Sequence, residues 1–567
     1  MIKRSLSFGG TRFSPFVVSR ASPWHEQVHR VRRRLQHAKP VSLALAPRQD
    51  DDPRGFPATG DTIYALSTAQ GRAGIAVIRI SGPSCLQIYR ALCPDTQPPK
   101  PRRATIRTIF HPNSSAHPNV LDSEALLLYF PCPKTATGED VLELHVHGGP
   151  ATVKAVLSAI PQCPTTSSPR YAEPGEFTKR AFFNGRLDLA QIESLGDTLD
   201  AETEQQRRAA VRGNSGALGR TYEGWREQLL QARGEIEALI DFSEDQHFDE
   251  SQSELLDNVA GQVSGILDGI HLHEIGGQRS ELLRKGVRIA LVGPPNVGKS
   301  SLMNIIVGRE ASIVSGEAGT TRDVVEASLD IRGYLCSFAD TAGFRSRGDA
   351  RGDGHVDIGA VEEEGIRRAR KKALESDLIV VLASVERDRA SGAKPYIHFD
   401  KETLDLAAGA LGAILVVNKR DAVDEDTLRD LLAQFRRSVG QSHPSFAGKP
   451  ICISCKDDVA TRDSGIQDVI QALTGSFSEM TDMPPEMRDL LGVTERQRQL
   501  LTKCRGHLEE FMDEARPEDE GVDADIVLAA EYLRYAADCL ARITGKGEAG
   551  DVEDVLGVVF EKFCVGK

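Results

Sequence analysis

The chain has 567 residues, 40% of them hydrophobic, and a formal net charge of −13 at pH 7. This length and apolar content allow roughly three or four domains with packed cores. The acidic balance argues against a protein that holds nucleic acid through its own surface alone, because sequence-independent affinity comes from neutralising phosphates. No run of about eighteen apolar residues occurs, and we therefore expect no membrane span.

Residues 1–58 are expected to be a lead segment that precedes the folded domains. Up to Arg48 the segment holds ten Lys or Arg, and Glu26 is its one acidic residue. This composition, with interspersed serines, is typical of a mitochondrial transit peptide and predicts the mitochondrial matrix as the location. Without these residues the net charge falls from −13 to about −22, since ten positive charges and one negative charge are removed. A basic arm that binds nucleic acid is the alternative interpretation.

Two blocks of different pattern follow. Residues 59–186 mix short apolar runs with Gly and Pro turns, which predicts an α+β domain. In residues 187–285 the pattern becomes helical, because apolar residues recur at helical spacings and form one stripe. The stripe consists of Trp225, Leu229, Ile236 and Ile240.

A phosphate-binding loop opens the next block, residues 286–475. Residues 293–301 read GPPNVGKSS and lie between the apolar run 287–292 and a helix-like stretch. Glycines let backbone N–H groups turn toward phosphates, Lys299 can reach the β- and γ-phosphate oxygens, and the Ser300 hydroxyl can join the shell of Mg²⁺. The loop predicts a nucleoside triphosphate site.

Four further motifs follow in the order of a guanine-nucleotide switch domain. Asp421 can accept hydrogen bonds from N1 and N2 of guanine, and adenine has no matching pair of donors. A threonine of the first motif offers a hydroxyl to Mg²⁺, and the second motif can hold the metal shell and sense the γ-phosphate. The alternation of strands and helices in this block predicts a parallel-sheet fold. The motifs are Gly319–Asp323, Asp340–Gly343, Asn418–Asp421 and Ser454–Lys456.

The residue after Gly343 departs from Ras-like domains. It is Phe344, where those domains have a Gln that orients water, so hydrolysis needs another route. Asn296 can help hold a monovalent cation against the phosphates, which would stabilise charge as the γ-phosphoryl group leaves. Glu362 in VEEEGIRRA is a second candidate. The alternative for this acidic run is a solvated helix face.

The ten cysteines have no disulfide-like spacing, which fits a reducing compartment. The one C-x-x-C, from Cys452 to Cys455, overlaps the last switch motif and is interpreted as a coincidence. No second C-x-x-C accompanies it, so we expect no zinc site. His145 and His147 are assigned to a strand end rather than to a metal.

The last block, residues 476–567, is again helical. Apolar residues repeat every seven positions with three more between them, and we expect this helix to end at Gly545. Because helical blocks flank the switch domain, the predicted fold is an α/β and α+β multidomain protein. A Ras-like parallel-sheet G domain is inserted in a discontinuous helical bundle, which an α+β domain precedes. The repeating residues are Ile526, Ala529, Leu533, Ala536, Leu540 and Ile543.

Together these residues resemble the family of tRNA-modifying GTPases called MnmE or TrmE. The resemblance runs from about Asp61 to Lys567, with Val565 where the family commonly has Ile and with a segment, 345–359, that is longer than usual. The segments that carry it are DTIYALST, TGEDVLELHVHGG, EPGEFTKRAFFNGRLDLAQIESLGDTLDAET, GPPNVGKSS, AGTTRD, VEEEGIRRA and the C-terminal FCVGK.

The resemblance implies the ligands of the nucleotide site. Potassium would be held by Asn296, Ser315, Glu317 and Thr320, and Mg²⁺ by Ser300 and Thr321. Glu362 would position water in the manner of a general base, and Lys299 would act beside it on the phosphates. The residues that contact GTP would be Asn296, Val297, Gly298, Lys299, Ser300, Ser301, Ser315, Gly319, Thr320, Thr321, Asp340, Thr341, Ala342, Gly343, Asn418, Lys419, Asp421, Ser454, Cys455 and Lys456.

The resemblance also implies a reduced folate, 5-formyl- or 5,10-methylene-tetrahydrofolate, in the α+β domain. The matching positions are Arg79, Glu143, Arg186 and Lys567, and Lys also occurs in the family at the position of Arg186. Cys564 would take part in the modification. The alternative for Cys564 is a small buried hydrophobic residue.

The resemblance finally implies partners and an overall reaction. The partners would be tRNA, a second copy of the chain and an FAD-dependent subunit, MnmG or GidA, in a heterotetramer. The predicted function is a potassium-stimulated GTPase that modifies C5 of the wobble uridine, U34, in mitochondrial tRNAs with a 5-carboxymethylaminomethyl or related aminomethyl group. The folate would donate the one-carbon unit. The alternatives are a GTP-dependent ribosome-assembly switch that binds RNA without modifying it, and a folate-dependent transferase with a regulatory G domain.

Overall fold

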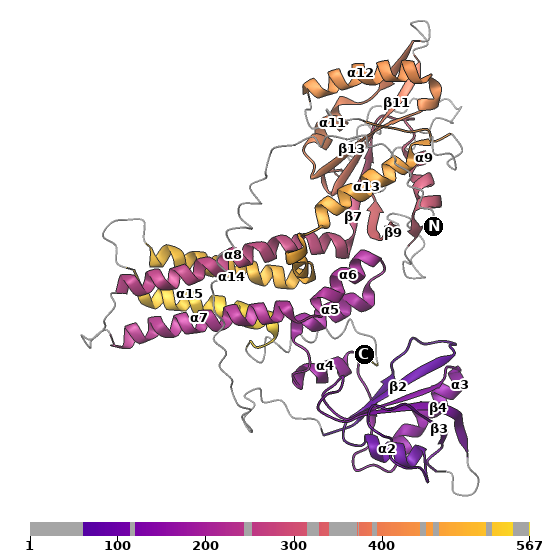
Figure 1. Ribbon diagram of the computed structural model, residues 1–567, viewed down its shortest axis with the longest axis vertical. Coiled ribbons are helices and arrows are strands. Elements are labelled where there is room, and N and C mark those ends of the chain that lie inside the picture. Colours follow the sequence, from indigo (N-terminus) through magenta and orange to yellow (C-terminus); the bar gives the residue numbers. More distant parts are fainter. Residues whose placement is uncertain are drawn as a thin grey trace, which may run out of the picture. The chain divides into compact units, whose positions relative to one another are not determined.

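The structure of the protein is a computed structural model (Figure 1). The described part of the chain belongs to one unit, Ala58–Lys567. The expected transit peptide lies outside the described residues. These are residues 60–113, 119–242, 252–313, 328–339, 371, 373–387, 394–442, 450–456, 464–516, 524–547 and 566.

A six-stranded mixed sheet forms the first part of the described chain. Its strand order is β3-β4-β5-β2-β1-β6, and every neighbouring pair is antiparallel except β1 and β6. Two helices, α2 (Cys85–Leu92) and α3 (Pro150–Ala159), share a core with the sheet. The strands are β1 (Ile63–Leu66), β2 (Ile75–Ser81), β3 (Thr105–Phe110), β4 (Val120–Phe130), β5 (Val141–His147) and β6 (Arg170–Tyr171).

The two faces of this sheet differ because side chains alternate along each strand. On one face, the apolar residues of β2 and β5 are buried against α2 and α3. On the other face lie the intervening residues Arg79, Glu143 and His145, which are only partly buried. These two helices therefore cover the apolar face. On the opposite face, Phe177 of α4 (Glu176–Phe183) packs on Ile63 and Ala65 of β1, beside the polar row.

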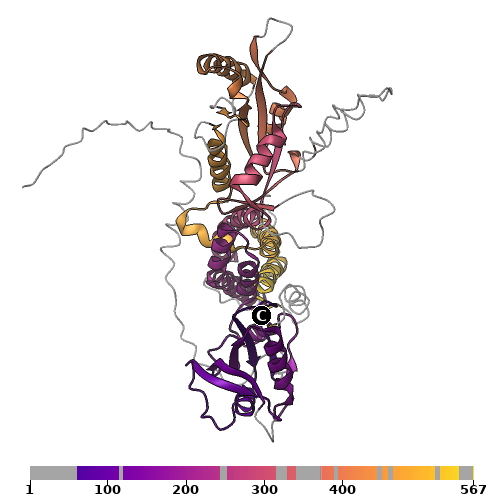
Figure 2. The ribbon, with the colours of Figure 1, turned by 90° about the vertical axis from the view of Figure 1, so that its right-hand side faces the viewer.

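Four long helices pack around a second hydrophobic core (Figure 1) and are seen nearly along their axes in Figure 2. The predicted apolar stripe on α7 is confirmed, because Leu229 and Ile236 are buried and Trp225 and Ile240 pack against the same core. The predicted end of α15 is also confirmed, since Gly545 caps it with φ 79°, a conformation that favours glycine. The four helices are α7 (Ala217–Phe242), α8 (Gln252–Lys285), α14 (Glu495–Ala515) and α15 (Ile526–Thr544).

Three shorter helices stand between the mixed sheet and this bundle in the sequence. They are α4 (Glu176–Phe183), α5 (Leu189–Asp200) and α6 (Glu204–Gly213). Asp188 and Thr203 close capping boxes at the starts of α5 and α6, as Thr494 does at α14. Each box satisfies N–H groups that have no partner inside the helix, which fixes where these helices begin.

An eight-stranded sheet forms the inserted domain. Its order is β14-β13-β11-β7-β10-β9-β8, and β12 pairs with β11. The five strands from β14 to β10 are parallel, whereas β8, β9 and β12 are antiparallel to their neighbours. The strands are β7 (Val287–Val292), β8 (Ser312–Ile313), β9 (Ser328–Ile331), β10 (Tyr334–Phe338), β11 (Leu378–Arg387), β12 (Pro395–His398), β13 (Gly412–Asn418) and β14 (Ile451–Cys452).

Helices cover both faces of this sheet, which explains why its central strands are almost continuously apolar. In β7, Ile289 and Leu291 share a core with α9 (Lys299–Ile305) and α13 (Ile466–Thr481). Ala290 and Val292 share one with α11 (Lys401–Ala408) and α12 (Glu425–Ser442). The predicted fold class, a parallel-sheet G domain within a helical domain that a mixed-sheet domain precedes, is confirmed.

The expected end of the G domain at residue 475 falls inside α13. This helix continues to Thr481 because Phe477, on its apolar side, is still buried against the sheet. A 3-10 segment, Pro485–Gly492, then leads to α14. None of the described helices is both long and apolar enough to cross a membrane.

The chain leaves the helical bundle at the end of α8 and returns to it at α14, and Arg284 joins these two points. Its Nε donates to a carboxylate oxygen of Asp197 on α5 at 2.8 Å. Its two terminal nitrogens donate to the backbone carbonyls of Val493 at 2.8 Å and Gly492 at 3.3 Å. One side chain thus ties the outgoing chain, the returning chain and α5 together.

Backbone contacts support the same junction. A Cβ atom on Gly492 would lie 2.7 Å from the Cα of Gly213 on α6, so the close approach requires glycine. The backbone N–H of Gln205 donates to the carbonyl of Gly333 at 3.1 Å. Gly333 lies in the β9–β10 turn, and α6 therefore contacts both the returning chain and a hairpin of the G domain.

Replacing Arg284 by Met should destabilise the protein, because three hydrogen bonds are lost and the carboxylate of Asp197 loses its cation. The Arg284 and Asp197 side chains are 20% and 29% exposed, and we expect a loss on the order of 2–3 kcal/mol. Thermal unfolding followed by circular dichroism would show it as a midpoint lowered by several degrees.

Arg516→Met is the matched control. Arg516 pairs with Asp257 elsewhere on the same bundle, and the two side chains are 52% and 64% exposed, so its loss should cost less than about 1 kcal/mol. Equal midpoints for the two variants would contradict a special role for Arg284.

Candidate functional site

The phosphate loop keeps its shape through residues with positive φ. These are Gly293 at 144°, Asn296 at 62° and Gly298 at 103°. A Cβ atom at Gly293 would lie 2.2 Å from the carbonyl oxygen of Leu382, and one at Gly298 would lie 2.1 Å from Nδ2 of Asn418. Both glycines are therefore required by the close approach of β11 and β13 as well as by the turn itself.

Lys299 begins α9 and is only 6% exposed. Its Nζ donates to the backbone carbonyls of Gly293 at 2.8 Å and Pro294 at 2.7 Å. Burial lowers the pKa of this ammonium to about 8. A nearby anion would favour the charged form of Lys299, so the loop suits a phosphate. Ser300 and Ser301 follow on the first turn of the same helix.

Asn418, the last residue of β13, joins three of the predicted motifs. Its Nδ2 donates to the carbonyl of Val297 in the phosphate loop at 2.8 Å. Its Oδ1 accepts from the backbone N–H groups of Lys419 at 2.7 Å and Cys455 at 3.3 Å. The phosphate loop and the motifs 418–421 and 454–456 therefore meet at one edge of the sheet, as the carboxyl ends of parallel strands do.

The carboxylate of Asp421 is held by its neighbour in the next loop. The Ser454 hydroxyl donates to Asp421 Oδ1 at 2.9 Å, and Ser454 Oγ accepts from the backbone N–H of Lys456 at 3.3 Å. Burial raises the pKa of the Cys455 thiol to about 11, so this cysteine stays neutral. Asp421, the predicted reader of guanine, is thus oriented from the side of the 454–456 loop.

The carboxyl end of β11 adds residues that the sequence analysis did not single out. Glu386 forms an ion pair with Lys419 at 3.1 Å and accepts from the Ser384 hydroxyl at 3.1 Å. Arg387 donates to the carbonyl of Ala422 at 2.8 Å. In the sequence, only their place could have indicated them: they follow an apolar strand and therefore lie at the edge of the sheet where the other motifs lie.

The remaining residues predicted for the nucleotide and the metals lie outside the described residues. Asn296 and Ser300 are the described members of the expected potassium and magnesium sets. In the part of the chain that the structure describes, no group of three or more His, Cys, Asp or Glu is arranged to hold a metal. The residues outside are Ser315, Glu317, Gly319, Thr320, Thr321, Asp340, Thr341, Ala342, Gly343, Phe344, Glu362, Cys564 and Lys567.

A second polar cluster lies on the face of the mixed sheet opposite α2 and α3, beside Phe177 of α4. Arg79 on β2 and Glu143 on β5 are direct cross-strand partners and form an ion pair at 3.0 Å. His145 lies two residues further along β5, and its Nε2 is 3.4 Å from the other carboxylate oxygen of Glu143. The ring of Phe177 lies 5.9 Å from the Arg79 guanidinium carbon. Two of the four residues predicted for folate are thus in contact with each other.

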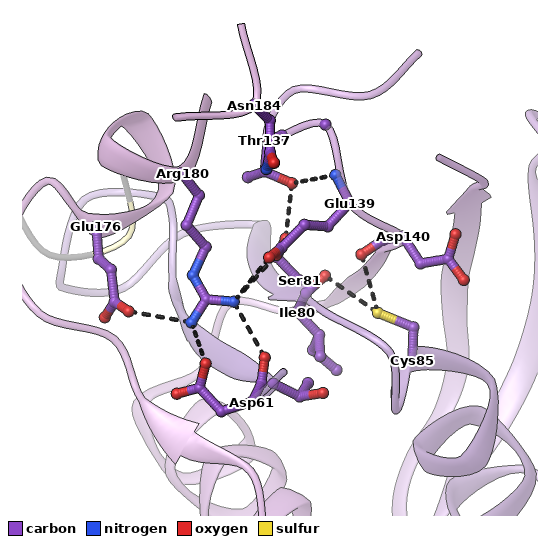
Figure 3. Close-up of polar contacts among 12 residues, drawn as sticks. Asp61, Ile80, Ser81, Cys85, Thr137, Glu139, Asp140, Glu176, Arg180 and Asn184 are labelled. Carbon is purple, nitrogen blue, oxygen red and sulfur yellow. Dashed lines mark hydrogen bonds and ion pairs between the residues drawn. The ribbon is translucent and has the colours of Figure 1, made fainter. Parts of the chain in front are cut away.

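A network of charges holds the loop between β4 and β5 against α4 (Figure 3). Arg180, whose side chain is 6% exposed, lies 3.0 Å from Glu139, 2.8 Å from Asp61 and 3.1 Å from Glu176. Glu139 also accepts from the hydroxyl of Ser81 at 2.8 Å. Because Ser81 is the last residue of β2, the network fixes this loop at the end of the strand that carries Arg79.

Arg186 is positioned by the same loop. Its Nε donates to the carbonyl of Thr135 at 2.9 Å, and Asn184 donates to the carbonyl of Thr137 at 2.7 Å. These bonds place Arg186 on the loop rather than within the ion pair of Arg79 and Glu143.

Gly566 brings the C-terminal end of the chain to the mixed sheet. Its carbonyl accepts from the Ser67 hydroxyl at 2.8 Å. A Cβ atom on Gly566 would lie 2.1 Å from the carbonyl oxygen of Leu66, the last residue of β1, and φ is 95°. The contact therefore requires glycine at the position before Lys567.

Two family models match the chain. The model described as GTP-binding protein TrmE N-terminus matches residues 62–186. The model described as MnmE helical domain matches residues 189–564. The second match covers both helical blocks and the G domain between them.

Named relatives match along nearly the whole length. The mitochondrial 5-taurinomethyluridine-tRNA synthase subunit GTPB3 of Danio rerio is 37% identical over 510 residues, covering 89% of this chain and 93% of the relative. The mitochondrial tRNA modification GTPase MSS1 of Saccharomyces cerevisiae is 36% identical, with coverage of 89% and 93%. The tRNA modification GTPase MnmE of Parvibaculum lavamentivorans is 40% identical, with coverage of 89% and 100%. With the nucleotide loop, the helical domain and the mixed-sheet domain all matched, the chain belongs to the MnmE/TrmE family of tRNA modification GTPases.

Proposed function

We propose that this chain is a mitochondrial, potassium-stimulated GTPase that works with an FAD-dependent partner subunit on C5 of the wobble uridine in mitochondrial tRNAs. The observation that carries the GTPase part is the junction at Asn418, which brings the phosphate loop and both base-side loops to one edge of the sheet. Relatives named as mitochondrial tRNA modification GTPases support the substrate and the location. The name synthase subunit supports a partner.

The proposed hydrolysis uses residues in separate roles. Lys299 would neutralise charge on the β- and γ-phosphates, which its buried position beside the loop favours. Asp421 would accept from guanine while Ser454 holds it. Asn296 would provide one oxygen ligand for potassium, with Ser315, Glu317 and Thr320, and such a cation would supply positive charge at the phosphates. Glu362 would position water.

A reduced folate fits the chemistry of the second polar cluster. The Glu143 carboxylate can accept from the amino group and ring N–H of a pterin, and it already accepts from Arg79 on the same face of the sheet. Arg186 and Lys567 carry the charge that suits the glutamate tail of a folate. The contact of Gly566 with Ser67 supports the inclusion of Lys567, because Gly566 is its neighbour in the sequence and lies against the end of β1.

The same proposal includes the domain divisions near residues 58, 186 and 285. It also includes a part for Cys564 in the modification. The runner-up is a GTP-dependent switch in ribosome assembly that binds RNA without modifying it. The presence of a mixed-sheet domain with a polar, folate-compatible face favours the modification, because a switch alone has no use for a one-carbon donor.

Loss of the gene should abolish the 5-substituted wobble uridine in mitochondrial tRNA, and the wild-type chain should restore it. Mass spectrometry of nucleosides from purified mitochondrial tRNA is the measurement. Lys299→Ala should fail to restore the nucleoside because GTP turnover is lost, and Cys564→Ser should fail if its thiol takes part. An unchanged nucleoside profile on deletion would favour ribosome assembly.

GTP hydrolysis should be at least about tenfold faster in potassium chloride than in sodium chloride at equal ionic strength. A tenfold change corresponds to about 1.4 kcal/mol of transition-state stabilisation. Phosphate release under saturating GTP measures it, and Asn296→Ala should remove the difference. Equal rates in the two salts would rule out the cation site.

Glu362→Ala should reduce turnover while GTP binding remains, and full turnover would remove Glu362 from the mechanism.

The full-length protein should release or absorb heat when titrated with 5-formyl-tetrahydrofolate. Arg79→Ala should weaken this binding by about tenfold or more, because the variant leaves the partly buried Glu143 without its cation. Arg90→Ala, an exposed arginine on α2, is the control and should bind as the wild type does. If the wild-type protein does not bind 5-formyl-tetrahydrofolate, the folate assignment is wrong.

A further inference from the structure

We propose that Glu386 is a positioning residue of the guanine site, which sets the affinity for GTP and GDP by holding Lys419. Glu386 lies at the carboxyl end of β11, and its carboxylate is 3.1 Å from the Lys419 ammonium. This inference rests on the proposed role of the loop 418–421 in nucleotide binding. It adds a residue that belongs to none of the switch motifs.

The loop that carries Asp421 needs external support. Lys419 has φ 63°, which is unfavourable for a residue with a side chain and costs on the order of 1 kcal/mol. Its backbone N–H is held by Asn418 Oδ1 at 2.7 Å. The ion pair with Glu386 fixes the orientation of the Lys419 side chain at this strained backbone position.

Glu386 is itself fixed in place. The buried Ser384, its neighbour on the same side of β11, donates to Glu386 Oε1 at 3.1 Å, and the same oxygen receives Lys419. Burial alone would raise the pKa of Glu386, but hydrogen bonding and charge from Lys419, with Ser384, outweigh burial and lower it. The carboxylate is therefore charged at neutral pH.

The next residue of β11 holds the far side of the same loop. Arg387 donates to the carbonyl of Ala422 at 2.8 Å, and Ala422 ends the short helix that contains Asp421. Glu386 and Arg387 thus fix the residues on either side of Arg420 and Asp421. β11 pairs with β13 from Leu378 to Ser384, and beyond this point Glu386 and Arg387 pair with Tyr396 and Pro395 of β12. Strand pairing therefore holds both residues independently of the γ-phosphate.

The geometry predicts a change in binding and not in the chemical step. Lys419 and Asp421 are on the base side of the site, so their position matters equally for GTP and GDP. The two side chains of the ion pair are 35% and 30% exposed, and screening keeps the effect modest. For Glu386→Gln we expect both dissociation constants to rise by about threefold, with kcat at saturating GTP unchanged.

Equilibrium titration of the full-length protein with fluorescent GTP and GDP analogues tests this. Asp426→Asn, which removes the carboxylate of a surface ion pair with Arg429 on α12, is the matched control and should bind as the wild type does. In a Lys419→Met background, Glu386→Gln should have no further effect. Nucleotide affinity that is unchanged or tighter in Glu386→Gln, or an effect that persists in the Lys419→Met background, would overturn the inference.

Asp421→Asn separates this failure from failure of the proposed site. An amide at position 421 can donate to the additional carbonyl of xanthine, so this variant should bind XTP better than GTP. If Asp421→Asn keeps its preference for GTP, the assignment of the base site is wrong. If the preference switches while Glu386→Gln binds normally, the site stands and the role of Glu386 is wrong.

Discussion

The architecture depends on one constraint. The chain has to leave the helical bundle, form a complete parallel-sheet domain and return to the bundle, while the core of the bundle stays closed. Arg284 meets this constraint, because a single guanidinium reaches Asp197 and two backbone carbonyls of the returning chain. The glycine pair 213 and 492 allows the backbones to approach closely. Since the N–H of Gln205 on α6 also donates to the carbonyl of Gly333, the helical domain is joined to the G domain through backbone groups.

Within the G domain, Asn418 also joins several segments through one side chain. One buried amide uses its donor for the phosphate loop and its oxygen for two further loops. The positions of the phosphate side and the base side are therefore not independent. The end of β11, through Glu386 and Arg387, adds a second support for the base side. A nucleotide would meet a base side that is already organised, while residues expected to contact the γ-phosphate lie in segments outside the described residues.

The two faces of the mixed sheet differ in polarity. The apolar face is closed by α2 and α3, which leaves the polar row of Arg79, Glu143 and His145 on the other. Arg180 binds three carboxylates, and this network holds the 135–140 loop beside that row. Gly566 reaches the same domain from the other end of the sequence. Gly566 and the end of β1 consequently lie in contact, although 499 positions separate Ser67 from Gly566.

Local patterns in the sequence were enough to determine the elements and the family. The phosphate loop, the stripe on α7 and the glycine stop of α15 could each be predicted, because turn conformation and side-chain periodicity depend on near neighbours. The end of α13 could not, since its last turn is held by packing of Phe477 on the sheet. The partners of Glu386 and Arg284, and the meeting of Gly566 with β1, were likewise decided by tertiary structure alone. These contacts join residues far apart in the sequence, and their existence depends on strand register and helix packing, which no short segment encodes.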